Sequence, residues 1–399
     1  MTKLWETSPL TEAATAGLLA FAPSIRIADC TLRDGEQQAG IVLNPADKLA
    51  IARALDALGV YEIEAGTPAS SKEDREAVET IAAAGLSAKV SALARARRDD
   101  VDELAAIGCR GARLSFPISN IQRQAKFAGM SDDKYLSVAL EITEYVKERG
   151  LECIFSPFDT TRCDLAFLRR VLGEFSRRGT VDRVRVVDTT GCATPHIARY
   201  LVRQMKEAGS IPIEAHFHDD FGLAVANTIA AAEAGAEYLS VTMNGIGERA
   251  GNASLEETVV ALKVLYGIDT GIRTEKLTAA CRLVEETSGV TLQRHKAVCG
   301  KGAFAHESGM VVAALMKDPF AAECYVPELV GQARQIVYGK KSGAAAIKSK
   351  LDELGLETGD AELRAIVDAV KTEALRLKRS LDDAELVRVA NAALAVARA

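Results

Sequence analysis

A two-part unit recurs eight times between residues 25 and 270. Each unit pairs a short β-type run with a longer run whose apolar residues are spaced three or four apart, and a glycine often separates that run from the next β-type run. Strands that alternate with helices form a parallel sheet with right-handed crossovers. The predicted strands are residues 25–32, 61–66, 89–94, 111–116, 152–157, 183–189, 213–218 and 238–243.

Eight such units in roughly 250 residues predict a closed (β/α)8 TIM barrel of the α/β class. A doubly wound open sheet is the alternative, but it usually has fewer strands, and no G-x-G-x-x-G motif follows the first predicted strand. We predict an N-terminal segment (1–24), the barrel (25–274) and a smaller, mostly helical C-terminal extension (275–399). Two helices are expected in the extension, at 360–378 and 382–398.

The composition excludes several classes of function. The chain has 399 residues, 48% hydrophobic and 26% charged, which is ordinary for a soluble globular protein. A net charge of −6 without a basic block gives no support for a nucleic-acid partner. No apolar run approaches a membrane span, and the N-terminus lacks the basic region of a signal peptide. Eight cysteines without a C-x-x-C pair indicate free thiols, so we expect a cytoplasmic protein.

Polar side chains follow most of the predicted strands at the point where each strand ends. In a barrel of parallel strands these carboxyl ends share one rim, where active sites lie. Six strand ends with such residues at one rim indicate a functional site. The side chains concerned are Arg33, Asp34, Arg95, Ser115, Asp188, Thr189, His216, His218 and Asn244.

The segment H-F-H-D-D (216–220) predicts a metal site. Alternation along a strand puts His216 and His218 on one face, and Asp34 is the natural carboxylate from another strand end. Two imidazoles and a carboxylate are suited to bind Mn, Zn, Fe or Co, and a site with more carboxylate ligands is better suited to Mg. The alternative is two histidines held by neighbouring hydrogen bonds. Only five histidines occur, and two lie on one predicted strand beside acids, which favours the metal.

The glycine-rich segment N-G-I-G-E-R-A-G-N-A-S-L-E-E (244–257) follows the last predicted strand. Ser254 and Glu257 form a capping box for the next helix, but this does not explain Glu248, Arg249 and Asn252 in the same loop. A loop next to the first and seventh strands can reach the same metal.

Three motifs resemble the signatures of the DRE-TIM metallolyase family: D-C-T-L-R-D-G-E-Q-Q-A-G (29–40), the segment beginning H-F-H-D-D-F-G-L-A at 216, and the loop at 244–257. The resemblance runs from about residue 25 to 350. The family includes isopropylmalate, homocitrate and citramalate synthases and, more distantly, HMG-CoA lyase. D-G-E-Q is typical of its Claisen-type synthases. L-S-F-P-I-S-N (114–120) and L-Y-G-I-D-T-G-I (265–272) are most similar to homocitrate synthases of nitrogen-fixing bacteria.

The resemblance implies a role for each matching residue. Asp34, His216, His218 and Asn252 would hold a divalent metal (Mg, Mn, Zn or Co) that polarises a 2-oxo acid. Arg33 would stabilise the developing alkoxide. Acetyl-CoA would be the co-substrate, 2-oxoglutarate the acceptor and homocitrate the product, and the protein would be a homodimer. The residues implied to bind the 2-oxo acid are Gln37, Arg95, Ser115 and Thr189.

Three positions depart from the family pattern. Phe158, Val311 and Ala322 stand where the synthases have a glutamate, a histidine and a tyrosine of the proton-transfer apparatus. None of the three can accept a proton. We therefore predict His306 or Glu307 as the base, with Tyr325 as a further candidate. The alternatives are a metal-dependent aldolase or lyase, a different 2-oxo acid condensation, or a non-catalytic paralogue that binds a 2-oxo acid.

Overall fold

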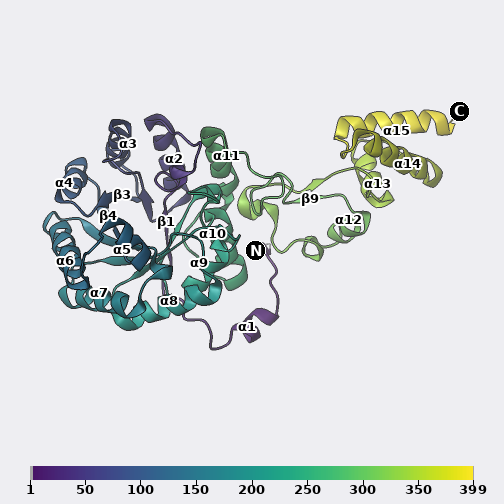
Figure 1. Ribbon diagram of the computed structural model, residues 1–399. Helices are drawn as coiled ribbons and strands as arrows, with labels where there is room; N and C mark the ends of the chain where they lie inside the picture. Colours follow the sequence, from purple (N-terminus) through teal and green to yellow (C-terminus); the bar gives the residue numbers. More distant parts are fainter. Residues whose placement is uncertain (1–2, 399) are drawn as a thin grey trace. The chain divides into compact units, whose positions relative to one another are not determined.

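The computed structural model describes residues 3–398, which form two compact units (Figure 1). One unit is residues 8–292; the other joins residues 3–7 to residues 293–398. The sequence predicts the division after residue 274, but helix α11 (Leu277–Ser288) packs against α2 (Pro45–Leu58) in the first unit. The compact barrel unit therefore extends beyond the predicted boundary.

Residues 8–292 form a closed barrel of eight parallel strands, as predicted. Each strand pairs with the next along the chain, and β8 closes the barrel on β1. The strands are β1 (Arg26–Asp29), β2 (Glu62–Glu64), β3 (Lys89–Arg95), β4 (Gly111–Pro117), β5 (Glu152–Phe158), β6 (Arg183–Asp188), β7 (Ile213–Phe217) and β8 (Tyr238–Val241). Parallel pairing brings all eight carboxyl ends to one rim.

Helices surround the barrel (Figure 1). Their local signals are those expected: α2 begins with a capping box at Asn44 and Pro45 in its first turn, and it ends at Gly59 in the left-handed conformation. Besides α2 and α11, the helices are α1 (Leu10–Thr15), α3 (Lys72–Ala82), α4 (Arg98–Ile107), α5 (Asn120–Lys126), α6 (Asp132–Glu148), α7 (Leu165–Arg178), α8 (Pro195–Ala208), α9 (Ala224–Glu233) and α10 (Leu255–Tyr266).

The barrel interior is charged, whereas most barrels fill this space with branched aliphatic side chains. Glu62, Glu64, Arg113, Arg183, Arg185 and Glu214 all point inward and are buried. They pair across the interior: Arg113 with Glu62 and Glu214 at 2.6 Å each, Arg185 with Glu64 at 2.8 Å and Glu214 at 2.7 Å, and Arg183 with Glu62. Buried charges are tolerated only when they are paired, so these ion pairs hold the six side chains in fixed positions.

The second unit has its own apolar core. It contains a two-stranded parallel sheet of β9 (Ala305–His306) and β10 (Gln335–Ile336), followed by helices. The predicted C-terminal helices are confirmed as α14 (Asp360–Leu377) and α15 (Asp383–Arg398), which pack against each other. Two helices precede them: α12 (Gly309–Leu315) packs against α13 (Ala344–Glu353), and α13 packs against α14. Their core includes Ile347, Leu351, Ile366 and Val370.

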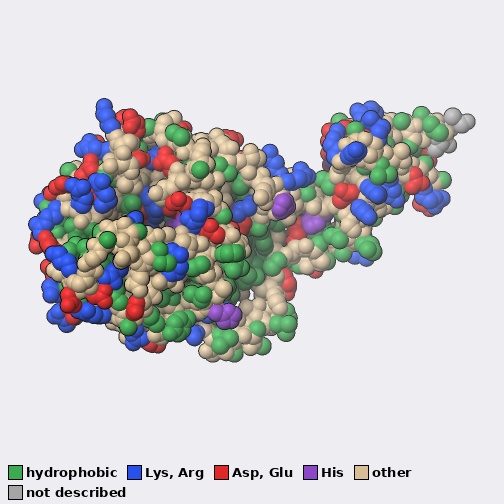
Figure 2. Space-filling view, in the orientation of Figure 1, with side chains coloured by type: hydrophobic (Ala, Val, Ile, Leu, Met, Phe, Trp, Pro, Cys, Tyr) green, Lys and Arg blue, Asp and Glu red, His purple; other side chains and the backbone are tan. Residues whose placement is uncertain are grey.

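The surface carries charges of both signs. On the face shown in Figure 2, Lys and Arg side chains are interspersed with Asp and Glu over the barrel unit. Among the described residues, no helix has both the length and the apolar character needed to cross a membrane.

Candidate metal centre and its pocket

Asp34, His216 and His218 come together at the carboxyl rim of the barrel. Asp34 lies in the turn after β1, while His216 is the penultimate residue of β7 and His218 directly follows the strand. One ligand atom from each lies within 4.8 Å of the others, and all three residues are buried. His218 Nε2 is 3.9 Å from Asp34 Oδ2. Ligand atoms this close can surround one divalent ion at the usual distance of about 2.0–2.2 Å.

Both histidines are oriented through Nδ1. His216 Nδ1 lies 3.1 Å from Ser240 Oγ, and His218 Nδ1 donates to the Gly251 carbonyl at 3.2 Å. The carbonyl can only accept, so the His218 proton lies on Nδ1 and its Nε2 lone pair remains available to a metal. Burial lowers the pKa of His216 to about 3, so this imidazole is neutral at neutral pH. Neutral imidazole is the form that binds metals.

Asn252 completes the cluster from the loop after β8. Its Nδ2 donates to Asp34 Oδ2, and its Oδ1 is buried without a hydrogen-bond partner in the described part of the chain. A buried carbonyl-type oxygen beside a carboxylate and two imidazoles fits a fourth metal ligand. All four residues implied as metal ligands thus lie together.

Arg33 is held beside the cluster by two carboxylates. Its Nη1 donates to Asp34 Oδ1 at 2.7 Å, and its Nε donates to Glu64 Oε1 at 2.6 Å. Burial opposes ionisation of Asp34, but the Arg33 guanidinium outweighs it and lowers the Asp34 pKa. Burial likewise opposes the charged form of Arg33, and Glu64 and Asp34 raise its pKa. Both groups are therefore charged at neutral pH.

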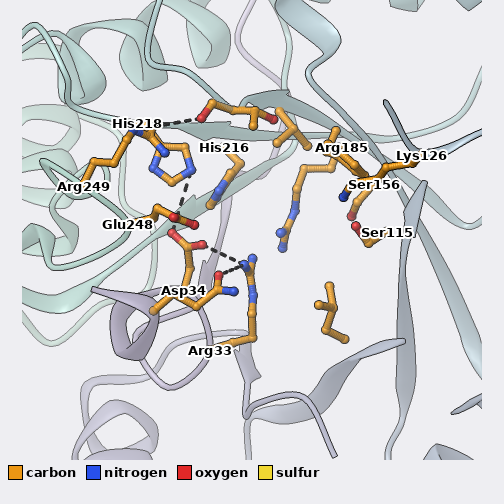
Figure 3. A pocket seen from close by; sticks show the side chains of 15 residues that line it. Arg33, Asp34, Ser115, Lys126, Ser156, Arg185, His216, His218, Glu248 and Arg249 are labelled. Atoms are coloured by element: carbon orange, nitrogen blue, oxygen red, sulfur yellow. Dashed lines mark hydrogen bonds and ion pairs between the residues drawn. The ribbon is translucent and has the colours of Figure 1, made fainter. Parts of the chain in front are cut away.

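A pocket of about 190 Å³ opens above the cluster (Figure 3). Its size suits a small acid rather than a whole coenzyme A molecule. It contains Gln37, Ser115 and Thr189, which the resemblance implies as substrate contacts, and Phe158, one of the departures from the family pattern. The other lining residues are Arg33, Asp34, Leu93, Lys126, Ser156, Arg185, Val187, His216, His218, Glu248 and Arg249.

The HMGL-like family profile matches residues 24–284, which include the whole barrel and every residue of this pocket. The chain belongs to the HMGL-like family. This confirms the resemblance to the DRE-TIM metallolyases. A second profile, described as homocitrate synthase post-HMGL domain-like, matches residues 298–378 of this HMGL-like chain.

Several curated relatives of this HMGL-like chain are named as synthases. It is 44% identical to a homocitrate synthase of Methanopyrus kandleri, over 90% of this chain and 91% of that protein. It is 43% identical to an (R)-citramalate synthase of Methanocaldococcus jannaschii (92% and 74%) and 42% identical to a 2-isopropylmalate synthase of the same organism (84% and 64%). Among solved structures, an HMG-CoA lyase from Bacillus subtilis has a TM-score of 0.61 at 20% identity, covering 69% of this chain and 97% of that one. This last likeness concerns the fold alone.

One implied substrate contact of the HMGL-like barrel lies outside the pocket. Arg95 is the last residue of β3 and occupies one of its inward-facing positions. Its guanidinium nevertheless donates two hydrogen bonds to Asp100, at 2.8 and 2.9 Å. Asp100 lies in the first turn of α4, close enough to hold both nitrogens. Arg95 is therefore not among the residues that line the pocket.

The two predicted bases lie in the second unit. His306 Nε2 is 3.0 Å from Glu323 Oε1. Glu307 accepts hydrogen bonds from the Lys341 backbone N–H at 2.9 Å and from the Ser380 hydroxyl at 3.0 Å, so both of its oxygens are engaged within that unit. Val311 and Ala322, the other two departures from the family pattern, are exposed.

Three polar residues of the pocket are not among the predicted site residues: Lys126, Ser156 and Arg185. Strand parity could have identified two of them. Ser156 is the register partner of Ser115, and Arg185 precedes the pocket residue Val187 by two positions on β6. Lys126 ends the short helix α5, and no periodic pattern places that helix relative to the rim.

Proposed function

We propose that this chain is a metal-dependent synthase that condenses acetyl-CoA with a 2-oxo acid and releases CoA. The observation that carries the proposal is the cluster of Asp34, His216, His218 and Asn252 beside the buried cation Arg33. The names of the relatives support it, because homocitrate, citramalate and isopropylmalate synthases all stand among them.

The proposed ligands are Asp34 Oδ, the Nε2 atoms of His216 and His218, and Asn252 Oδ1, and the metal would be Mg, Mn, Zn or Co. Bound there, a divalent metal supplies Lewis-acid polarisation of the 2-oxo carbonyl. Ser240 and the Gly251 carbonyl hold the imidazoles in the ligating orientation. Such partners typically matter about 10- to 100-fold in metal affinity.

Arg33 is placed to stabilise negative charge on the carbonyl oxygen. Its Nε and Nη1 are fixed by Glu64 and Asp34, and its Nη2 makes no hydrogen bond within residues 3–398. A guanidinium anchored on one edge presents its other N–H groups without reorganisation when the alkoxide forms.

Thr189 is suited to donate to a substrate oxygen. Its Oγ1 accepts a hydrogen bond from the Asp159 backbone N–H at 2.7 Å, so the hydroxyl hydrogen remains available to donate. Gln37 adds an amide beside Arg33, to which its Oε1 lies at 3.1 Å. We assign both side chains to the carboxylate end of the 2-oxo acid.

The proposed reaction balances without a redox partner. A base removes a proton from the acetyl-CoA methyl group, and the resulting carbon nucleophile forms a bond to C2 of the 2-oxo acid. The carbonyl electrons move to its oxygen, which takes up a proton to become the hydroxyl group, and water then cleaves the thioester to give a carboxylate and the thiol of CoA. Of the two predicted bases, His306 is the better candidate, because Glu307 is engaged by Lys341 and Ser380.

Thiol release tests the proposal. Purified protein with Mn²⁺ or Mg²⁺ and acetyl-CoA is expected to release CoA with at least one 2-oxo acid from a panel containing pyruvate, 2-oxoisovalerate and 2-oxoglutarate. We propose 2-oxoglutarate as the best acceptor and homocitrate as the product. Chelation should abolish the release. Absence of CoA release with every acid would reject the proposal.

A metal-dependent lyase or aldolase is the second candidate, and the departures at Phe158, Val311 and Ala322 favour it. Such an enzyme would release a 2-oxo acid from homocitrate or citramalate without CoA. A non-catalytic paralogue would instead be stabilised thermally by 2-oxo acids and turn over nothing. The homodimer and the cytoplasmic location stay predictions.

A further inference from the structure

The two histidines of the cluster differ in what faces their Nδ1 atoms. His218 Nδ1 faces the Gly251 carbonyl, which can only accept a hydrogen bond, whereas His216 Nδ1 faces the hydroxyl of Ser240 at 3.1 Å. A hydroxyl can donate as well as accept. If Ser240 donated, the single proton of the neutral His216 imidazole would lie on Nε2, the proposed ligand atom. A further group must therefore decide the His216 tautomer.

Cys30 is the second polar neighbour of the Ser240 hydroxyl. The residue directly follows β1, next to β8, and is buried. Ser240 Oγ lies 3.4 Å from Cys30 Sγ, and Cys30 Sγ lies 3.5 Å from the Val241 carbonyl oxygen. Within residues 3–398, the Ser240 hydroxyl makes no hydrogen bond besides those to Cys30 and His216. The direct distance from Cys30 Sγ to His216 Nδ1 is 4.0 Å, so the serine is the closer partner of the imidazole.

The strand register brings these side chains together. His216 on β7 pairs with Ser240 on β8, and Val241 pairs with Asp29, the last residue of β1. The backbone N–H of Cys30 also donates to the Val241 carbonyl, at 2.8 Å, which fixes the thiol relative to this carbonyl. None of His216, Ser240 and Cys30 is more than 2% exposed, so bulk water does not compete for their hydrogen bonds.

One order of donors satisfies every group in this chain of hydrogen bonds. The Val241 carbonyl can only accept, so the Cys30 thiol donates its one hydrogen there. Toward Ser240 the sulfur can then only accept, so the hydroxyl donates to it. Toward His216 the hydroxyl oxygen can in turn only accept, and the imidazole proton lies on Nδ1. The opposite order makes one hydrogen bond fewer, because the thiol hydrogen would point at Ser240 and away from Val241.

We propose that Cys30 is a positioning residue of the metal centre: through Ser240 it keeps the His216 proton on Nδ1 and thereby leaves Nε2 to the metal. The inference goes beyond the proposed function, because it concerns the metal-free protein and depends neither on acetyl-CoA nor on a 2-oxo acid. It requires only that His216 is a metal ligand.

The tautomer of His216 is measured directly in the metal-free protein. Long-range ¹H–¹⁵N correlation spectra of protein labelled with ¹⁵N-histidine distinguish the protonated ring nitrogen from the unprotonated one. The chain has five histidines, and the signal that is lost in His216→Asn identifies the residue. We expect Nδ1–H in the wild type. In Cys30→Ala a resolved Nε2–H signal should appear, because the Val241 carbonyl no longer directs the Ser240 hydroxyl.

Mn²⁺ affinity, measured by calorimetry, is the second readout. Cys30→Ala is expected to weaken Mn²⁺ binding about threefold to tenfold, the effect of one hydrogen bond. Cys30→Ser keeps a donor and an acceptor, so it should retain the Nδ1–H tautomer and bind Mn²⁺ within about twofold of the wild type. Cys153→Ala is the matched control: it also removes a buried free thiol, near the start of β5 and away from the rim, and should change neither readout.

A double-mutant cycle shows whether Cys30 acts through Ser240. Ser240→Ala should weaken Mn²⁺ binding about tenfold or more, as the loss of a group that orients a metal ligand implies. Once Ser240 is replaced, adding Cys30→Ala should cost less than about a further twofold, because the thiol no longer reaches His216 through the hydroxyl. Losses that simply add would overturn the proposal.

An Nε2–H tautomer in the metal-free wild type would overturn the proposal without any substitution, so the proposal stays testable if a variant fails to fold. It would also be overturned by an unchanged tautomer in Cys30→Ala, by equal losses in Cys30→Ala and Cys153→Ala, or by a Cys30→Ser protein that behaves like Cys30→Ala. A wild type that binds no Mn²⁺ would overturn it together with the proposed metal site. Normal Mn²⁺ binding without CoA release would reject the proposed function alone.

Discussion

Glu64 is the residue on which the geometry of Arg33 depends. Its Oε1 accepts from Arg33 Nε at 2.6 Å and its Oε2 from Arg185 Nη2 at 2.8 Å, and it is fully buried. Burial opposes ionisation, but Arg33 and Arg113 outweigh it and lower the Glu64 pKa. Glu64 therefore stays charged at neutral pH and fixes the Arg33 side chain.

Glu64→Gln keeps the shape and removes the charge. We expect about 3–5 kcal/mol of destabilisation, because two buried arginines lose their shared partner. We also expect kcat to fall about 10- to 100-fold with little change in the KM of the 2-oxo acid, because the donor to the alkoxide loses its position. Denaturant unfolding and steady-state kinetics measure both. Glu79→Gln, in an exposed pair with Arg75, should cost at most about 1 kcal/mol. A stable, fully active Glu64→Gln protein would contradict this account.

Asp29 makes the stability of the protein depend on pH. Burial raises its pKa from 3.8 to about 7, with contributions from Glu64 and Glu256, although Thr31 donates to both of its oxygens. Between these two values the unfolded chain releases the proton and the folded chain keeps it. The folded state is thus favoured below pH 4 and loses this advantage as the pH rises toward 7.

Asp29→Asn removes that titration. The variant is expected to gain stability relative to the wild type as the pH rises from 4 to 7, with a slope of up to about 1.4 kcal/mol per pH unit and a plateau above pH 7. Denaturant unfolding at pH 5, 6, 7 and 8 measures the slope. A pH-independent difference between the two proteins would show that Asp29 titrates normally.

At the scale of elements, the loop after β8 organises the cluster. It provides Asn252, and its Gly251 carbonyl orients His218. Gly247 in the same loop packs so closely that an added Cβ would overlap the Asn252 amide and lie 3.2 Å from Asp34 Oδ2. The loop can therefore approach the metal ligands only with glycine at this position.

Gly247→Ala is expected to weaken Mn²⁺ binding about 10- to 100-fold, the usual effect of disturbing the groups that orient metal ligands. Calorimetric titration of the purified protein with Mn²⁺ measures it. Gly173→Ala is the control: it lies within helix α7, where an added Cβ finds its nearest neighbour at 3.9 Å, and it should leave Mn²⁺ affinity unchanged. Unchanged affinity in Gly247→Ala would mean that the loop adjusts without displacing Asn252.

At the scale of elements, strand alternation and barrel topology predict part of the site from the sequence. Period-two alternation fixed the facing of His216 and His218, and parallel topology brought Asp34 to the same rim. Arg95 occupies a position of β3 whose side chain faces the barrel interior, but the nearby Asp100 binds its guanidinium. The hydrophobic pattern of a sequence does not determine which rotamer a side chain adopts. Lys126 depends on the path of a short loop helix, which local propensity does not determine.

At the scale of the whole molecule, the two units have separate cores. The second unit packs α13, α14 and α15 around Leu351, Ile366 and Val370, all fully buried, while the metal cluster lies in the barrel. A change in the core of the second unit should therefore affect its own stability without altering metal binding by the barrel.

Ile366→Ala is expected to destabilise the second unit by about 2–5 kcal/mol. Mn²⁺ affinity should stay within about twofold, while CoA release should fall if His306 supplies the base. Thermal unfolding, Mn²⁺ titration and thiol release on the same samples test this. Leu375→Ala, at a side chain 55% exposed, should change stability by less than about 1 kcal/mol. A matching loss of Mn²⁺ affinity in Ile366→Ala would show that the two units fold as one.

The charged barrel interior restricts which substitutions can accumulate during evolution. Replacing Arg113 or Glu62 alone removes one of two buried partners from the other, because Arg113 also pairs with Glu214 and Glu62 with Arg183, and it leaves the interior charges unbalanced. Such a step is strongly selected against, whereas a joint exchange for two apolar residues of similar volume is tolerated. Positions 62 and 113 should therefore covary among descendants of one ancestor, both charged or both apolar.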